Sequence, residues 1–241
     1  MSATLRVIGV GPGDPELITL KAARAIAAAP VIAYFCKTGK PGHARTIAAA
    51  HIAPAHTELR FEYPFTTERE VTDHRYAIDM AAFYESSAGT IAAHLNDGRD
   101  VALLCEGDPF FYGSSMYLFD RLARVHATDI IPGVTGMSGC WTRAHTPMTH
   151  GDDILTVLPG TLDEDTLAAR LREGEATVIM KLGRNLTKIR AALARTGLAE
   201  RAIYVERGTM SDEVIRPFAE VSADRAPYFA LVLIPGRQRT R

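Results

Sequence analysis

Two glycine-rich turns directly follow apolar segments of the chain, and both contain the tripeptide Gly-Asp-Pro. The first, GVGPGDPEL, spans residues 9–17, and the second, CEGDPFFYGS, spans residues 105–114. Glycine lets another group approach the backbone closely, and an Asp before Pro suits the start of a helix. Ligands of open parallel sheets bind beyond the carboxyl ends of strands, where neighbouring loops diverge. We therefore expect the two turns to line one binding cleft.

The first turn matches only part of the dinucleotide-binding pattern. Gly9 and Gly11 fill the first two positions of G-x-G-x-x-G, but Asp14 holds the third. The pattern also needs an acidic residue about 20 positions later to bind the ribose, and no Asp or Glu occurs between Leu17 and Thr57. A dehydrogenase is therefore kept only as a third alternative, which calorimetry with NAD would test.

Composition narrows the class of protein further. The 241 residues contain 27 Lys and Arg against 28 Asp and Glu, which argues against a nucleic-acid partner. Three widely spaced cysteines match neither a disulfide framework nor a metal site, and indicate a reducing, cytoplasmic location. The longest apolar run, Ala25 to Cys36, is shorter than the about 20 residues that span a membrane. We expect no membrane segment and no metal.

One loop carries residue types that bind metals elsewhere. Its spacing matches no zinc pattern, and we interpret it as a hinge. The residues in question are His145, His150, Asp152 and Asp153.

Strand-like and helical segments alternate along the chain. In the first half we expect strands at 5–10, 31–35, 100–105 and 128–133, and helices at 15–29, 73–96, 115–124 and from about 135. This alternation predicts a mostly parallel sheet covered on both faces. The later strands ILTVL, ATVIMKL, RAIYVE and YFALVLI, with helices at 163–172 and 186–196, predict a second α/β unit with a mixed sheet. We expect an α/β fold of two domains, residues 1–134 and 135–241.

Five blocks of the sequence resemble, in order, the tetrapyrrole methylases of cobalamin and siroheme biosynthesis, which use S-adenosylmethionine (SAM). The blocks are GVGPGDPELITLKA, CEGDPFFYG, IPGVTGMSG, MKLGRN and YVERGTM, and the resemblance runs from about Leu5 to Gly236. CEGDPFFYGS, YPFTTE and MKLGRN resemble the branch that methylates C-20 of precorrin-2. The resemblance implies a homodimer of two-domain subunits, with SAM in the cleft between the domains and S-adenosylhomocysteine (SAH) as a product.

The resemblance also implies which residues bind SAM. Glu106 and Leu182 depart from the general family pattern, so their contacts are expected through backbone or shape. The matching positions are Pro12, Glu106, Gly107, Asp108, Phe111, Thr135, Gly136, Leu182 and Gly208.

Methyl transfer from SAM needs alignment of nucleophile, methyl and sulfur in a weakly polar site. When the acceptor is a meso carbon, a proton must later leave it, and a side-chain base can assist. The candidates at the two turns are, in order of preference, Glu106, Asp14 and Tyr112. Water is the alternative base, and a helix cap is the alternative role of Asp14.

A uroporphyrin-derived substrate is a polycarboxylate, so its pocket should be basic. Residues 17–57 include five basic residues and no acidic one. Lys37, Lys40 and Arg45 lie in and just after a Gly/Pro loop that we expect to fold over the cleft and bind carboxylates. A solvated charged surface is the alternative. The same reaction on a cobalt-containing substrate, and a non-catalytic SAM or tetrapyrrole sensor, also remain open.

Overall fold

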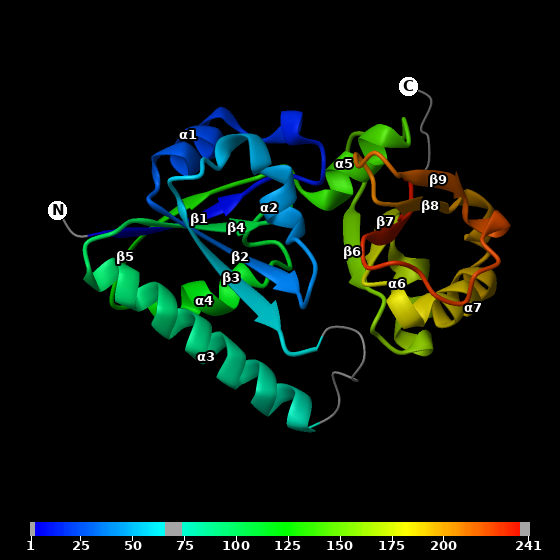
Figure 1. Ribbon diagram of the computed structural model, residues 1–241. Coiled ribbons are helices and arrows are strands. Elements are labelled where there is room, and N and C mark those ends of the chain that lie inside the picture. Colours follow the sequence, from blue (N-terminus) through cyan, green and yellow to red (C-terminus); the bar gives the residue numbers. More distant parts are fainter. Residues whose placement is uncertain (1–2, 66–73, 237–241) are drawn as a thin grey trace. The chain divides into compact units, whose positions relative to one another are not determined.

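The computed structural model describes residues 3–65 and 74–236, and its chain divides into two compact units (Figure 1). The first unit comprises residues 1–136 and the second residues 137–241. The division lies two residues after the predicted domain boundary. Each unit has its own five-stranded sheet and its own apolar clusters on the two faces of that sheet.

The first unit contains a parallel sheet with the strand order β3-β2-β4-β1-β5. Its strands are β1 (Thr4–Gly9), β2 (Val31–Lys37), β3 (Thr57–Tyr63), β4 (Val101–Cys105) and β5 (Ala127–Ile131). The parallel sheet was predicted, but β3 was not. Leu59, Phe61 and Tyr63 alternate with three charged residues in β3, which is the period-two pattern of an edge strand with one buried face.

Helices cover both faces of this sheet. The helices are α1 (Leu20–Ala28), α2 (His43–Ile47), α3 (His74–Asn96) and α4 (Ser115–Leu122). Side chains of α1 and α2 pack in the cluster on one face, and those of α3 and α4 in the cluster on the other. The predicted helix 73–96 is thus confirmed from residue 74, and residue 73 lies outside the described residues.

The predicted helix at 15–29 is interrupted. A 3-10 turn, Pro15–Leu17, comes first, and α1 begins only after Thr19. The Oγ1 atom of Thr19 accepts a hydrogen bond from the N–H of Ala22 at 3.1 Å and so caps α1. The break therefore arises from a second capping residue inside the predicted helix.

Strands β1 and β4 are neighbours, and the chain leaves them in opposite directions (Figure 1). From β1 it passes through α1 to β2, which lies beyond β4, whereas from β4 it passes through α4 to β5, which lies beyond β1. Because α1 and α4 cover opposite faces, the two connections diverge at the carboxyl edge. Such a reversal is a topological switch point, where open α/β sheets bind ligands.

The second unit contains a mixed sheet with the order β6-β7-β10-β8-β9. Its strands are β6 (Leu155–Pro159), β7 (Ala176–Met180), β8 (Ile203–Glu206), β9 (Val214–Pro217) and β10 (Ala230–Ile234). The predicted mixed sheet is confirmed, and its antiparallel pairs include β8 with β9. Because β6 and β7 are parallel and β10 runs antiparallel to both β7 and β8, the carboxyl ends of β6, β7 and β8 share one edge.

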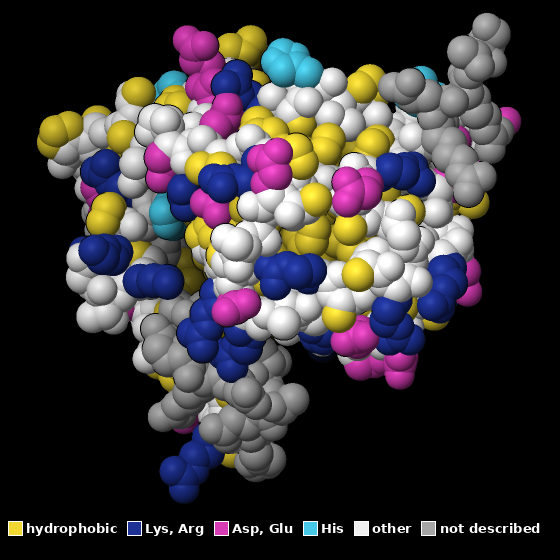
Figure 2. Space-filling model, turned by 90° about the vertical axis from the view of Figure 1, so that its right-hand side faces the viewer, with side chains coloured by type: hydrophobic (Ala, Val, Ile, Leu, Met, Phe, Trp, Pro, Cys, Tyr) yellow, Lys and Arg dark blue, Asp and Glu magenta, His cyan; other side chains and the backbone are white. Residues whose placement is uncertain are grey.

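Helices α6 (Glu164–Glu173) and α7 (Leu186–Thr196) cover one face of this second sheet, and α5 (Gly136–Arg143) packs on the other. On the molecular face shown in Figure 2, basic and acidic side chains are interspersed with apolar ones, in keeping with the balanced composition. In the described ranges, no helix has the length and apolar character needed to cross a bilayer.

Candidate functional site

The two predicted glycine-rich turns meet at the switch point of the first unit. The N–H of Gly107 donates to the carbonyl of Gly11 at 2.8 Å, and the N–H of Gly11 donates to the carbonyl of Gly107 at 3.4 Å. The N–H of Val10 also donates to the carbonyl of Cys105 at 2.9 Å, which extends the strand pairing into the turns. Gly11 and Gly107 both have positive φ, at 82° and 66°, a conformation that favours glycine. Pro12, the first proposed cofactor residue, is buried in the first of these turns.

A third turn, which follows β5, packs against the other two through glycine. A Cβ atom on Gly9 would lie 2.6 Å from both the carbonyl oxygen of Gly107 and the nitrogen of Gly133. A Cβ atom on Gly133 would meet the same carbonyl oxygen even more closely. Backbone therefore packs on backbone at three strand ends. Gly9 was considered only in the rejected dinucleotide pattern, and Gly133 was not singled out, although its place at the end of the fourth predicted strand was a usable signal.

The carboxylate of Asp108 links the second turn to the third. Its Oδ1 accepts a hydrogen bond from the N–H of Phe110 at 2.9 Å, and its Oδ2 accepts one from the N–H of Gly133 at 3.2 Å. Both oxygens are thus engaged by backbone donors. Asp108 fixes the shape of the site through these contacts.

Glu106 places a second carboxylate beside these turns. Its Oε1 accepts a hydrogen bond from the N–H of Ala44, in the first turn of α2, at 3.1 Å. Burial raises the pKa of the Glu106 carboxyl above its ordinary value, while backbone hydrogen bonds and the charge of His43 act in the opposite direction. A carboxylate with raised pKa is suited to accept a proton closer to neutral pH than a surface glutamate does.

The other two candidate bases have different surroundings. Asp14 caps the 3-10 turn, because its Oδ1 accepts a hydrogen bond from the N–H of Glu16 at 2.9 Å. Tyr112 is 43% exposed, has a positive φ of 59°, and packs edge-on against the ring of Phe111 at 5.0 Å. A non-glycine residue at positive φ is uncommon and is often found at binding sites. Tyr112 therefore presents an aromatic hydroxyl at the turn, whereas Asp14 has a local structural role.

Thr135 and Gly136 lie where the third turn leads into α5. A Cβ atom on Gly136 would meet no heavy atom within 4 Å, so this backbone faces open space. The nitrogen of Gly136 would itself lie 3.4 Å from a Cβ on Gly107. Within the first unit, the proposed cofactor residues of the second and third turns thus lie side by side.

The basic residues assigned to the substrate differ in how they are held. Lys37, at the end of β2, and Lys40, in the loop after it, are exposed. Arg45 is instead bound to Glu58 by two hydrogen bonds, from Nη2 to Oε1 at 2.9 Å and from Nε to Oε2 at 3.1 Å. The hydroxyl of Tyr34 donates to the same carboxylate at 2.8 Å. Glu58 lies in β3, directly after the acid-free segment 17–57, and pairs with Arg45. The expectation that this segment carries basic residues without an acidic partner is therefore corrected for Arg45.

Strained backbone marks the shared edge of β7 and β8 in the second unit. Lys181 and Gly183 follow β7 with positive φ values of 57° and 40°. The side chain of Leu182, between them, is fully buried in the core, so this residue offers a ligand only its backbone. A Cβ atom on Gly208, after β8, would lie 2.5 Å from the Sγ of Cys140 in α5. Cys140 itself is buried, and burial raises its pKa to about 12.

Residues 4–221 match the family profile described as Tetrapyrrole (Corrin/Porphyrin) Methylases. The chain belongs to this family. The tetrapyrrole methylase turns at residues 9–17 and 105–114 both lie within the matched range. Of the YPFTTE block, residues 66–68 lie outside the described residues.

Two relatives of this tetrapyrrole methylase carry informative names. A precorrin-2 C(20)-methyltransferase of Sinorhizobium sp is 52% identical over 229 residues, covering 95% of this chain and 94% of the relative. A cobalt-precorrin-2 C(20)-methyltransferase of Salmonella typhimurium is 27% identical over 240 residues, covering 97% of each chain.

Solved structures share the fold of this methylase. A cobalt precorrin-4 methyltransferase matches with a TM-score of 0.72 at 22% identity, covering 96% of this chain and 94% of that one. A uroporphyrin-III C-methyltransferase of Thermus thermophilus, complexed with SAH, matches with a TM-score of 0.65 at 22% identity, covering 96% and 97%. The predicted α/β fold with two sheets is confirmed.

Proposed function

We propose that this methylase transfers a methyl group from SAM to C-20 of precorrin-2, giving precorrin-3A and SAH in corrin ring biosynthesis. The observation that carries the proposal is the 52% identity, over nearly the whole of both chains, to a relative of that name. The joined turns at the switch point support SAM binding, because the SAM-binding pattern of the family falls on these turns. The solved relative with bound SAH supports the same cofactor.

The residues of the site fit a ligand that has an amino-acid end and an adenosine. At the switch point, Pro12, Thr135 and Gly136 offer peptide groups, and Gly107 and Gly136 have no side chains to block the approach of a ligand. Phe111 supplies an apolar surface. In the second unit, the proposed contacts come from the backbone of Leu182 and from Gly208. Asp108 holds two of the turns in register through its bonds to backbone N–H groups.

SAM, when bound, supplies an electrophilic methyl group on a sulfonium. The transfer forms a bond from the methyl carbon to C-20 and breaks the bond from that carbon to sulfur, whose electron pair stays on sulfur. C-20 must then lose a proton. We assign this proton to the carboxylate of Glu106, whose raised pKa suits the task. Tyr112 becomes the second candidate and Asp14 the third, because Asp14 caps the 3-10 turn. Water is the alternative acceptor.

Lys37 and Lys40 are the proposed partners of the substrate carboxylates. Both are exposed and precede α2, whose Ala44 N–H donates a hydrogen bond to Glu106. Arg45 still has N–H groups beyond those bound to Glu58, and we propose that these face a substrate carboxylate. Lys40→Ala should weaken tetrapyrrole binding and leave SAM affinity nearly unchanged. Arg45→Ala should do the same, and equal loss of both affinities would contradict the basic-segment proposal.

The deciding experiment incubates the purified protein with SAM and either metal-free or cobalt-containing precorrin-2, followed by mass spectrometry. We expect one added methyl group on the metal-free substrate. Methylation of the cobalt substrate alone would favour the activity named for the Salmonella relative. SAM binding without turnover on either substrate would instead indicate a sensor, and calorimetry should show binding of SAM and none of NAD.

Two further parts of the proposal concern the state of the protein in the cell. We propose a homodimer, as the family resemblance implies, which light scattering after size exclusion would test. We also propose a cytoplasmic location. Cys36, Cys105 and Cys140 are free and buried, which fits a reducing compartment.

A further inference from the structure

The turn after β8 has a backbone conformation that needs outside support. Arg207 and Thr209 have positive φ values of 47° and 72°, and they flank Gly208. Positive φ is a true outlier for a β-branched residue such as Thr209, and such conformations persist only where surrounding contacts over-determine them.

An acid from the same loop supports Thr209 directly. The Oε2 of Glu213 accepts a hydrogen bond from the N–H of Thr209 at 2.9 Å. The N–H of Glu213 donates to the carbonyl of Met210 at 3.2 Å, which closes the loop on itself. The side chain of Glu213 is only 18% exposed, so its carboxylate is largely withdrawn from water. A hydrogen bond between a charged acceptor and a backbone N–H is among the stronger kinds.

Helix α5 fixes this carboxylate. The Nε of Arg143, the last residue of α5, lies 2.8 Å from Oε1 and 2.9 Å from Oε2 of Glu213, and Nη2 also contacts Oε1. Three residues earlier in the same helix, Cys140 packs against Gly208. Helix α5 therefore touches the turn twice, once at Gly208 and once through the ion pair that holds Thr209.

We propose that Arg143 and Glu213 are positioning residues for SAM binding, because they hold the turn 207–209 in the conformation in which its peptide groups contact SAM. The inference rests on the proposed function, which places SAM at Gly208. We call the ion pair of Arg143 with Glu213, together with the hydrogen bond from Thr209 to Glu213, the clamp. Neither residue touches the reacting atoms. Loss of the clamp should therefore weaken SAM binding and leave the chemical step unchanged.

The test compares Glu213→Ala, Glu213→Gln, Arg143→Ala and Arg143→Lys with the wild type. We expect Glu213→Ala to raise the SAH dissociation constant, measured by calorimetry, and the KM for SAM about tenfold, because Thr209 loses its acceptor. The kcat at saturating SAM should stay within about twofold of the wild-type value. Removing an interaction that is equally strong in the ground state and the transition state raises KM and leaves kcat unchanged. Glu213→Gln should lose less affinity, because its amide oxygen still accepts from Thr209. Arg143→Lys should restore part of the loss seen in Arg143→Ala.

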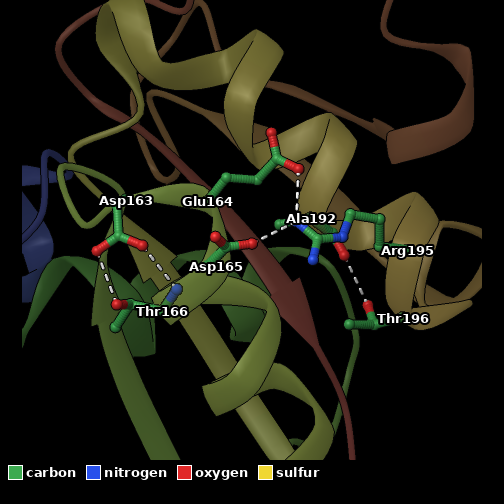
Figure 3. A network of polar contacts seen from close by, with 7 residues as sticks. All are labelled: Asp163, Glu164, Asp165, Thr166, Ala192, Arg195 and Thr196. Carbon is green, nitrogen blue, oxygen red and sulfur yellow. Dashed lines mark hydrogen bonds and ion pairs between the residues drawn. The ribbon is translucent and has the colours of Figure 1, made fainter.

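A matched control removes an ion pair of the same unit that does not reach the turn. Arg195 of α7 binds Glu164 at 2.8 Å and Asp165 at 2.9 Å, both in α6 (Figure 3). Arg195→Ala should leave SAH affinity at the wild-type value. A thermal unfolding midpoint for each variant separates loss of stability from loss of affinity.

The outcomes separate the clamp from the function on which it rests. Wild type that binds no SAH overturns the proposed function and the inference together. If wild type and Glu213→Ala bind SAH equally well, the clamp alone is overturned. It is also overturned if Arg195→Ala loses as much SAH affinity as Glu213→Ala does. If Glu213→Ala does not fold, Arg143→Ala decides, because it removes the ion pair that fixes Glu213 but keeps the carboxylate that accepts from Thr209. Wild-type SAH affinity in Arg143→Ala then overturns the clamp.

Discussion

Gly11 and Gly107 exchange backbone hydrogen bonds in both directions, at 2.8 and 3.4 Å, although one follows β1 and the other follows β4. The exchange makes the two Gly-Asp-Pro turns one structural unit at the switch point of the sheet. A change at one turn should therefore be felt at the other.

Replacement of Gly9 by alanine should disrupt the site. The new Cβ would lie 2.6 Å from backbone atoms of Gly107 and Gly133, and these atoms cannot shift without a loss of stability. We expect a destabilisation of about 1–3 kcal/mol by urea unfolding and a loss of SAH binding by calorimetry. Gly89→Ala is the control. Gly89 lies in α3 with open space around it, so alanine there should add about 0.5–1 kcal/mol of stability. Equal behaviour of the two variants would contradict close packing at Gly9.

Asp108→Ala should reduce both stability and SAH affinity. It leaves the N–H groups of Phe110 and Gly133 without their acceptor, at a cost of about 1–3 kcal/mol in the free energy of unfolding. Asp108→Asn keeps one acceptor oxygen and should lose less. The matched control is Asp163→Ala, because Asp163 also accepts two bonds, from the N–H and Oγ1 of Thr166 (Figure 3). That variant should lose some stability, because it removes a helix cap, and should keep its SAH affinity.

Glu106→Gln should slow methylation without weakening SAH binding. Loss of a proton acceptor typically lowers the rate about 10²-fold or more. Burial raises the pKa of Glu106 above the ordinary 4.5, so wild-type activity should fall as the pH is lowered through that raised value, because the protonated carboxyl accepts no proton. Glu106→Gln should lack this acidic limb, and Tyr112→Phe should retain it. A Glu106→Gln protein with full kcat would assign the proton to water or another group.

The ion pair of Arg45 with Glu58 should contribute stability that depends on pH. Arg45 lowers the pKa of Glu58 in the folded protein, so the contribution is present above the ordinary value of 4.5 and is lost as the pH falls through the folded value. Both side chains are about one third exposed, so we expect about 0.2–1 kcal/mol. The difference in unfolding midpoint between wild type and Glu58→Gln should be largest at neutral pH and shrink in acid. A constant difference would contradict the pairing.

Local pattern was sufficient to predict much of the first unit. The parallel sheet, the long helix α3 and the two turns follow from periodicity and turn residues, which act over a few positions. Strand β3 was missed even though its alternation is clear, because charged residues occupy every second position. Because β3 was missed, its residue Glu58 was not considered as a partner of Arg45, and their ion pair was not predicted.

Contacts between distant segments account for what the sequence did not reveal. Nothing in the letters ERGTM indicates that Thr209 has a positive φ, or that Arg143, far earlier in the chain, holds the acid that supports it. Likewise, the packing of Gly133 on Gly107 depends on strand order, which places β5 beside β1. Pairings of this kind are set by the assembled sheets.

The full burial of the Leu182 side chain has a consequence for how such enzymes diversify. In the proposed SAM site, a methyl donor held through peptide groups and glycines would be insensitive to the identity of most surrounding side chains. Loops that receive the macrocycle are then free to vary, and new acceptors can be adopted while the donor stays the same.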